Sequence, residues 1–382
     1  MMLSRPFYSL LSFTVLVGLL VLSACETPEK VLKSTSIEYK KAKATQWYNK
    51  KEYVKCIPVL EELIGLLKGR ESVEDFYYMY CMANYKQGDY MISAYHYKNF
   101  FDQYPNGVHA EECLYMYAKS YLQLSPKPDL DQTYTLKALE AFQYFFNMFP
   151  DSKYTNESND AVSKLRKKLE KKALSSADLY YRTQNYKAAA TSYENLLKDY
   201  PDIEDNEKIS FMIVKANYKY AENSVFEKRV ERFKHVIESY QSFKYKFAQS
   251  KYLEEAQKYE QQSHYLAVKS SFEWADACPL GDKERTYKTA FAEAKQQLPF
   301  IADEKQKQEF SDWIERGHFM IVKNYFLLSE MKKEKERETA LQKTVQNYYT
   351  FADLFPKSKY FKEAEKIFLN STEQLKKLKS NG

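Results

Sequence analysis

The thiol of Cys25 has the setting that most favours covalent chemistry. It follows Leu22-Ser-Ala, at the end of an apolar run from Phe7 to Leu22 that begins just after Arg5. One positive charge, an apolar stretch shorter than the roughly 20 residues of a spanning helix, and a small-residue cleavage site together predict a secretory signal peptide. A thiol at such a site can form a thioether to diacylglycerol before cleavage, and small residues let the extended chain enter a peptidase.

The sequence Leu22-Ser-Ala-Cys25 resembles a bacterial lipobox, in which the cysteine becomes the first mature residue and carries acyl groups such as palmitate. The resemblance predicts a signal peptide at 1–24, a lipidated linker at 25–35 and attachment to a membrane through the lipid. Several buried acyl chains, at about 0.8 kcal/mol per methylene, make such an anchor stable. The alternative is an ordinary secretory signal that happens to contain a cysteine.

Residues that commonly do catalysis or bind metals are not arranged for either task. The five histidines form no i, i+4 pair, and the sequence has no HExxH, GxSxG, Walker or GxGxxG motif. Adjacent carboxylates such as Glu61-Glu62 point about 100° apart on a helix, so they cannot flank one bond. Helical-repeat lytic transglycosylases need a lysozyme-like catalytic segment, which is missing. We expect no enzyme activity, no catalytic residue, no cofactor and no metal.

Charge and glycine content exclude further classes. Removal of the signal peptide lowers the net charge from +6 to +5, and charges of both signs are mixed along the chain. This pattern indicates a solvated surface and no nucleic-acid partner. Only eight glycines occur, although dinucleotide folds, phosphate loops and tight hairpins all need glycine. The composition favours helices joined by short polar turns.

Four cysteines remain after Cys25, and their spacing matches no zinc or CxxC pattern. They are Cys56, Cys81, Cys113 and Cys278. Most of them fall where a helical repeat needs a small buried residue, so we interpret them as core thiols. The alternative is a disulfide between Cys56 and Cys81, which an oxidising compartment would permit.

An aromatic residue followed by proline ends four helical patterns. Proline cannot continue a helix, so each of these dipeptides predicts the end of a helix pair. The four endings are Asp102-Gln-Tyr-Pro105, Asn147-Met-Phe-Pro150, Lys198-Asp-Tyr-Pro201 and Asp353-Leu-Phe-Pro356.

The best preserved unit runs from about Glu74 to Pro105 and resembles the tetratricopeptide repeat. With Gly88 at the turn, Cys81 and Ser93 fall at the two small positions where the helices cross. Tyr97 and Phe100 then take the packing positions. Five matches in one register make this resemblance specific.

The same register fits other segments. It places Ala44 and Cys56, then Ala177 and Ala189, at the small positions of further copies. A third copy, with Ala118 and Ala138, needs a proline-containing loop inserted at 124–131. We predict an all-α, tetratricopeptide-like superhelical solenoid with five repeats over 36–260, and a C-terminal helical extension over 261–382 that contains one more helix pair.

The first helix of each pair lines the concave face of such a superhelix. Helical periodicity predicts that this face carries Tyr48, Tyr78, Met82, Tyr85 and Lys86 in the first two repeats, and Tyr181 and Arg182 in the fourth. Aromatic surface beside charges suits the binding of a peptide. The alternative is a solvated face without a ligand, and most of the 35 tyrosines fill packing positions.

A lipobox followed by about five such repeats resembles the BamD family, lipoproteins of the outer-membrane β-barrel assembly machine. The likeness is sharpest from Leu124-Ser-Pro-Lys-Pro-Asp to Phe149-Pro-Asp-Ser-Lys-Tyr154, and from Leu165-Arg-Lys-Lys-Leu169 to Tyr200-Pro-Asp202. It covers about residues 25 to 260. The ending Phe355-Pro-Lys-Ser-Lys-Tyr360 repeats the first motif.

This resemblance implies a scaffold held at the periplasmic face of the outer membrane. Its partners would be unfolded outer-membrane proteins, bound by the first two repeats (Tyr48, Tyr78, Tyr85, Lys86), and a BamA-type barrel insertase, bound by the fourth and fifth repeats including Arg182. The alternative function is a repeat lipoprotein that binds peptides or glycans for nutrient capture. Such proteins resemble longer chains with tryptophan-rich loops, and this chain has three tryptophans.

Overall fold

The computed structural model describes residues 27–70 and 72–380, and all regular structure within them is helical. The all-α class predicted from the sequence is confirmed. The predicted signal peptide at 1–24 and Cys25 lie outside the described residues. The chain divides into two compact units, Met1–Lys172 and Ala173–Gly382, which are described separately.

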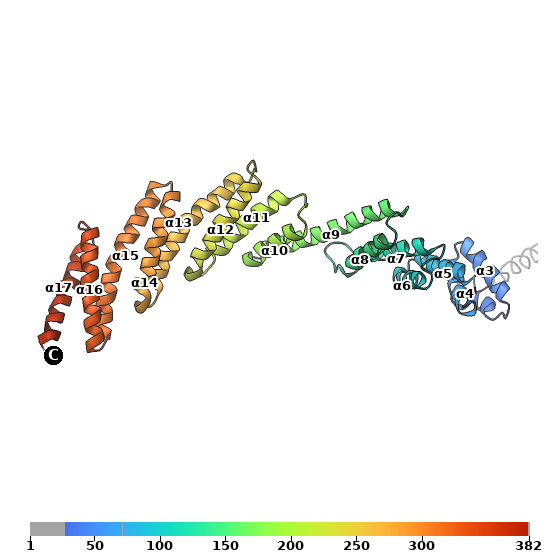
Figure 1. Ribbon diagram of the computed structural model, residues 1–382, viewed down its shortest axis with the longest axis horizontal. Helices are drawn as coiled ribbons and strands as arrows, with labels where there is room; N and C mark the ends of the chain where they lie inside the picture. The colour runs from blue at the N-terminus through green and yellow to red at the C-terminus, as the bar shows by residue number, and fades with distance from the viewer. Residues whose placement is uncertain (1–26, 71, 381–382) are drawn as a thin grey trace, which may run out of the picture. The chain divides into compact units, whose positions relative to one another are not determined.

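The first unit consists of helix pairs that stack in chain order, and from α2 to α8 each helix packs on the next (Figure 1). Its helices are α2 (Pro28–Leu32), α3 (Ile37–Asn49), α4 (Tyr53–Leu66), α5 (Val73–Gln87), α6 (Tyr90–Gln103), α7 (Ala110–Leu124), α8 (Thr133–Met148) and the beginning of α9 (Thr155–Arg182). The odd-numbered helices from α3 onward are the first helices of their pairs.

The turns inside three pairs share one geometry. The residue at the turn has a left-handed backbone, with φ of 94° at Gly88, 61° at Lys51 and 62° at Gln184. Only glycine adopts this conformation without strain, so the lysine and glutamine each cost about 1 kcal/mol. In all three turns the next amide donates to a carbonyl five residues back, to Asn84, Trp47 and Tyr180 respectively.

The small residues predicted for the helix crossings are confirmed. Ala44, Cys56, Cys81, Ser93, Ala118, Ala138, Ala177 and Ala189 are all fully buried. Small side chains there let two helices approach closely, while large rings such as Tyr97 and Phe100 fill the space between pairs. The four thiols described are free and buried, so the alternative Cys56–Cys81 disulfide is not formed.

The predicted loop over 124–131 is present between α7 and α8, and Gln132 organises it. This buried side chain donates to the carbonyls of Lys127 and Leu130, and its oxygen accepts from Thr135. Lys168 and Lys172 of α9 donate to the carbonyls of Ser125 and Leu130. The loop is therefore tied to the helix that follows it.

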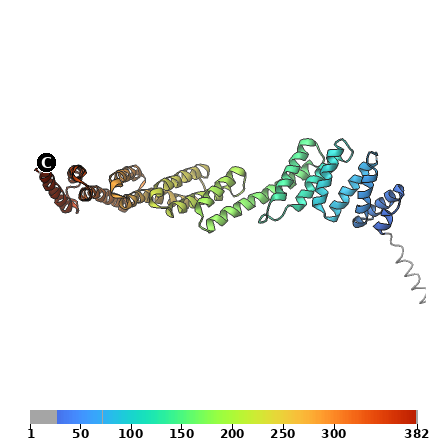
Figure 2. The same ribbon diagram turned by 90° about the horizontal axis from the view of Figure 1, so that it is seen from below.

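The second unit continues the helix pairs to the C-terminus, and neighbouring helices such as α15, α16 and α17 lie side by side in both views (Figure 1, Figure 2). After α9 come α10 (Tyr186–Asp199), α11 (Asn206–Glu222), α12 (Phe226–Lys246), α13 (Leu253–Ala277), α14 (Lys283–Gln297), α15 (Glu304–Met331), α16 (Glu334–Leu354) and α17 (Phe361–Ser380), with short 3-10 turns at Leu280–Asp282 and Leu298–Phe300.

Candidate binding surfaces

Tyr48, Tyr85 and Tyr181, three of the predicted binding residues, occupy the same position in their helix pairs. Each lies near the end of a first helix and packs edge-on against the tyrosine that begins the second helix, with ring centroids 5.2 to 6.0 Å apart. All three rings are half-buried. Part of each ring therefore holds the turn together, and the rest stays accessible for another contact.

The structure brings Tyr48 and Tyr78 together around Glu112, a residue that the sequence analysis did not select. Burial, and then the charge and hydrogen bonding of the Glu112 carboxylate, raise the pKa of Tyr78 well above its usual range. Burial also raises the pKa of Tyr48 to about 12, with smaller contributions from nearby groups that include Glu112. These residues come from α3, α5 and α7, so three consecutive first helices form one surface, which we call the first-helix face.

Met82 and Lys86 have different environments on α5. The Met82 sulfur accepts a hydrogen bond from the buried Tyr97 hydroxyl at 3.6 Å, and the side chain is half-buried. Lys86 is exposed in the last turn of the helix, where the negative end of the helix dipole stabilises a cation. Tyr85 lies nearer to Lys119 and Gln123 of α7 than to Glu112, as the contributions to its raised pKa indicate after burial.

The first helix of one pair contacts the beginning of the first helix of the next pair in a recurring arrangement, which we call a joint. In each joint an aromatic ring on the first helix stacks on a ring of the next first helix. A lysine four residues after the first ring reaches a glutamate three residues after the second. Three joints follow this pattern, with residues Tyr115, Lys119, Tyr154 and Glu157; Phe211, Lys215, Tyr252 and Glu255; and Phe319, Lys323, Tyr360 and Glu363.

The geometry of these three closed joints is nearly constant. The stacked rings lie 4.2 to 4.8 Å apart at angles of 5° to 8°. The lysine Nζ lies 2.8 to 3.1 Å from the glutamate oxygen, and 5.2 to 5.7 Å from the centre of the first ring. The ammonium therefore neutralises the carboxylate and also contacts the face of an aromatic ring.

The joint between α5 and α7 keeps the stack but lacks the lysine, and we call it the open joint. Tyr78 stacks on His109 at 4.0 Å and 9°, and Glu112 occupies the glutamate position. The lysine position, four residues after Tyr78, holds Met82. Among the ion pairs between residues that the structure describes, none involves Glu112.

A second difference lies just before the stacked residue. In the first closed joint the Ser152 hydroxyl donates to Glu111 at 2.5 Å. The matching residues of the open joint are Gly107 and Glu74. A Cβ on Gly107 would lie 2.1 Å from Glu74 Oε1, and this buried oxygen has no hydrogen-bond partner among the described residues.

In the second unit, the predicted residue Tyr181 lies near Lys219 of α11 and Glu255 of α13. Burial has the largest effect on the pKa of Tyr181 and raises it. Lys219 lowers this pKa and Glu255 raises it, both by less. Two further tyrosines enlarge this surface, since Tyr218 and Tyr259 pack with ring centroids 4.7 Å apart. The predicted Arg182 is the exposed last residue of α9.

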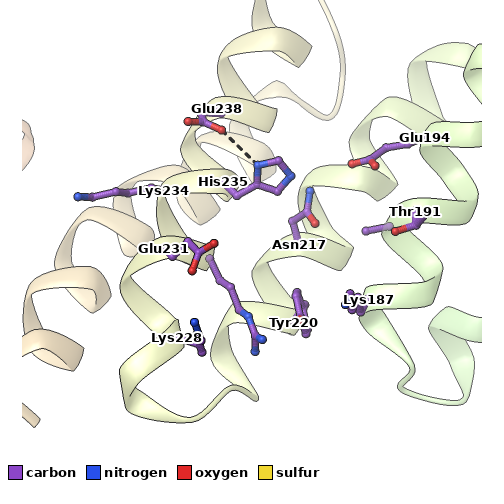
Figure 3. A pocket seen from close by; sticks show the side chains of 12 residues that line it. Lys187, Thr191, Glu194, Asn217, Tyr220, Lys228, Glu231, Lys234, His235 and Glu238 are labelled. Carbon is purple, nitrogen blue, oxygen red and sulfur yellow. Dashed lines mark hydrogen bonds and ion pairs between the residues drawn. The ribbon is translucent and has the colours of Figure 1, made fainter. Parts of the chain in front are cut away.

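A polar pocket of about 690 Å³ opens between α10, α11 and α12 (Figure 3). Its walls carry cations and carboxylates together. The lining residues are Lys187, Ala190, Thr191, Glu194, Asn217, Tyr220, Lys228, Glu231, Arg232, Lys234, His235 and Glu238.

The lining charges are unevenly distributed, although Glu231 and Lys234 lie between the two ends of the pocket (Figure 3). Lys187 and Lys228 lie near Tyr220 at one end, and Glu194 and Glu238 lie at the other (Figure 3). Arg232 stacks on the Tyr220 ring, with its guanidinium carbon 4.0 Å from the ring centre. The cationic end is suited to carboxylates of a partner, because arginine held on an aromatic ring presents its donors in a fixed orientation.

Within residues 27–70 and 72–380 no group of histidine, cysteine, aspartate or glutamate side chains has the geometry of a metal site. No helix in the same residues is long and apolar enough to cross a membrane. The predicted lipidation at Cys25 lies outside the described residues.

Comparison with known proteins identifies the family. A sequence model of the YfiO family, described as an outer membrane lipoprotein, matches residues 34–233, just over half of the 382 residues. The chain belongs to the YfiO family of outer membrane lipoproteins. The resemblance inferred from the lipobox and the repeats is thereby confirmed.

Individual curated and solved proteins are similar to the chain to different degrees. The putative outer membrane protein assembly factor BamD of Aquifex aeolicus is 25% identical over 229 residues, which are 59% of this chain and 72% of that protein. The TPR2AB domain of yeast Sti1 covers 74% of this chain and 98% of its own, at 12% identity and a TM-score of 0.29. A tetratricopeptide protein of Parabacteroides merdae covers 88% and 100%, at 11% identity and a TM-score of 0.25. The repeat architecture of this YfiO protein rests on its own helix pairs.

Proposed function

We propose that this YfiO-family lipoprotein is a scaffold subunit of the outer-membrane β-barrel assembly machinery, anchored through Cys25 and facing the periplasm. It binds unfolded barrel proteins on the first-helix face and a BamA-type insertase with its fourth and fifth helix pairs. Family membership and the name of the Aquifex relative support the role in assembly. The lipid anchor is supported by the lipobox sequence.

The observation that carries substrate binding is the convergence of Tyr48, Tyr78 and Glu112 on consecutive first helices. Half-buried tyrosines offer apolar ring surface to an aromatic side chain and hydroxyls to its backbone. Barrel proteins expose such side chains before they fold, because the outward face of a barrel strand is apolar. An extended chain lying along the face would contact tyrosines from successive pairs.

The test of this binding combines Tyr78→Ala with Tyr85→Ala. We expect affinity for a labelled, aromatic-ended barrel peptide to fall on the order of tenfold, since each ring provides packing that alanine cannot replace. Fluorescence anisotropy measures the affinity, and circular dichroism checks folding. Tyr95→Ala is the matched control, because Tyr95 is 63% exposed on α6, a second helix. Unchanged binding by the double variant would exclude the first-helix face.

The binding of the insertase is assigned to Tyr181, Arg182 and the cationic end of the pocket. Lys187→Glu combined with Lys228→Glu reverses two exposed charges without touching the core. We expect this variant to lose copurification with the insertase's periplasmic domains, and Arg182→Ala to weaken it. Lys244→Glu with Lys246→Glu makes the same change elsewhere on α12, and copurification should persist.

Depletion of the protein in the cell separates this function from nutrient capture. Loss of many outer-membrane barrel proteins at once is the result expected of an assembly subunit. Loss of growth on one nutrient, with barrel proteins intact, would instead support a capture lipoprotein and contradict the proposal.

A further inference from the structure

The open joint has a glutamate at the joint position where, in the three closed joints of the same chain, a glutamate forms an ion pair with a lysine. In those joints the carboxylates of Glu157, Glu255 and Glu363 each bind an ammonium at 2.8 to 3.1 Å. In three places of this chain, therefore, a carboxylate beside such a ring stack binds an ammonium group. In the fourth case the chain does not supply that group, because Met82 stands in place of the lysine.

The stacked rings show that the open joint is otherwise the same structure. Tyr78 and His109 are 4.0 Å apart at 9°, compared with 4.2 to 4.8 Å and 5° to 8° in the closed joints. Glu112 thus occupies the place of a residue that elsewhere is bound by lysine. The Tyr78 hydroxyl is a neighbour of this carboxylate, as its raised pKa indicates, and a carboxylate can accept from a further donor at the same time.

Three basic residues around the first-helix face pair with other carboxylates, and Lys86 lies one turn beyond Met82 at the exposed end of α5. Lys41 of α3 pairs with Glu38 at 2.9 Å. His109 turns its Nε2 toward Asp75, at 3.6 Å, and Lys119 is held by Glu157 in the next joint. The open joint therefore has net negative character beside the rings of Tyr48 and Tyr78.

We infer that Glu112 binds a lysine or arginine side chain of the polypeptide held on the first-helix face, which takes the place of the missing lysine. This inference rests on the proposed function and adds a charge requirement to it. The preferred segment pairs a basic residue with a nearby aromatic one. The aromatic side chain packs on Tyr48 and Tyr78, and the cation completes the joint.

The test uses synthetic peptides that end in the same aromatic residue. The peptides are made in pairs, one with lysine and one with glutamine at the same position. Each pair tests a different position before the aromatic residue. The full-length lipoprotein in detergent should bind the best lysine peptide about fivefold more tightly, the size typical of a partly exposed charge pair. This preference should shrink as salt is raised, because salt screens such pairs.

Two variants remove the preference by different routes. Glu112→Gln deletes the charge and Met82→Lys restores the internal lysine of a closed joint, so the ratio of the two affinities should fall to about one in both. Met82→Leu leaves position 82 without a charge and is the matched control, in which the ratio should persist. Glu112→Gln alone decides the matter if Met82→Lys fails to fold.

The outcomes distinguish this inference from the proposed function. If the wild-type protein binds both peptides equally, or if Glu112→Gln keeps the lysine preference, the inference is wrong and substrate binding on this face still stands. If neither peptide binds, the proposed function fails and the inference falls with it. If the preference for the lysine peptide is lost in Glu112→Gln and in Met82→Lys, the result supports both the inference and the proposed function.

Discussion

The open joint around Tyr78 and the closed joint around Tyr115 have the same geometry and different charges. Their rings stack at 4.0 Å and 4.2 Å, with angles of 9° and 5°. In the closed joint Lys119 bonds both Glu157 and the Tyr115 hydroxyl. In the open joint no such lysine is present. The stack therefore holds neighbouring pairs together without the ion pair, and this leaves the carboxylate of one joint available for binding.

The differences between the joints occur together. The open joint has methionine for lysine, histidine for tyrosine and glycine for serine, at Met82, His109 and Gly107. Two of these changes remove donors that bond carboxylates in the closed joint, the Lys119 ammonium and the Ser152 hydroxyl. Glu74 and Glu112 of the open joint thus lack the internal partners that the matching carboxylates have, among the residues that the structure describes.

The largest effect should come from breaking the stack of the closed joint. Tyr115 is only 4% exposed, so Tyr115→Ala creates a cavity and should cost about 3–5 kcal/mol. Tyr78→Ala should cost about 2 kcal/mol less, because Tyr78 is already half-buried and faces solvent on one side. Hydrogen exchange of amides in α5, α7 and α9 measures each loss locally. Equal losses of stability in Tyr115→Ala and Tyr78→Ala would mean that the different exposure of the two rings does not affect their contribution.

The next effect concerns the glycine of the open joint. Gly107→Ala places a Cβ where Glu74 Oε1 lies, 2.1 Å away, and the buried carboxylate must move at a cost of about 1–2 kcal/mol. Gly107→Ser adds the same Cβ and also the hydroxyl that Ser152 uses to bond Glu111. A hydrogen bond to a charged group is worth about 1.5–3 kcal/mol, so serine should be better tolerated than alanine. Urea unfolding followed by circular dichroism compares them, and the reverse order would contradict the correspondence of the two joints.

The helix pairs could be predicted from the sequence because their steric requirements are local. Two helices that cross closely need a small residue on each, and the eight positions named from the register set by Gly88 are all buried. The thiols of Cys56 and Cys81 were correctly interpreted as core residues for the same reason. Helical periodicity also placed Tyr48 and Tyr78 on a common side, although it identified the side of a helix and not the neighbours across it.

Glu112 was missed because it lies 34 residues after Tyr78 and no local pattern connects them. A repeated sequence signal for the joints does exist. Ser-Lys-Tyr followed by glutamate three residues after the tyrosine occurs at Ser152, Ser250 and Ser358. The second copy, Phe247-Ala-Gln-Ser-Lys-Tyr252, lacks the proline that made the other two visible. Aligning all three would have extended the repeat pattern beyond residue 260 and exposed the departure at His109.

The pocket between α10, α11 and α12 could not have been predicted from its residues. Its lining residues come from three helices, α10, α11 and α12, and no local sequence pattern encodes the spacing of these helices. Lysines and glutamates on helix surfaces are common, so neither Lys187 nor Lys228 carries a sequence signal. Only the structure shows that they share one cavity.

A smaller effect should follow from opening a closed joint. Lys119→Met removes the bonds to Glu157 and Tyr115 but keeps the stack, and it reproduces the lysine position of the open joint. The lysine side chain is 28% exposed and the glutamate 60%, so the loss should be about 1 kcal/mol or less. Urea unfolding measures it, with Lys137→Met on the exposed side of α8 as control. A loss as large as that of Tyr115→Ala would show that the ion pair, and not the stack, holds the joint.

The smallest effect is the response of the closed joint to acid. Hydrogen bonding by Lys119, and next by Tyr115, lowers the pKa of Glu157 below its ordinary value of 4.5. A carboxyl whose pKa is lower in the folded protein contributes stability above its unfolded pKa and loses it as the pH falls through the folded pKa. Since Glu157 is largely exposed, its share should be at most about 0.5 kcal/mol. The stability difference between wild type and Lys119→Met, measured by urea unfolding, should therefore be constant above pH 4.5 and shrink below it. A difference that grows in acid would contradict the ion pair, because protonated Glu157 no longer attracts the lysine.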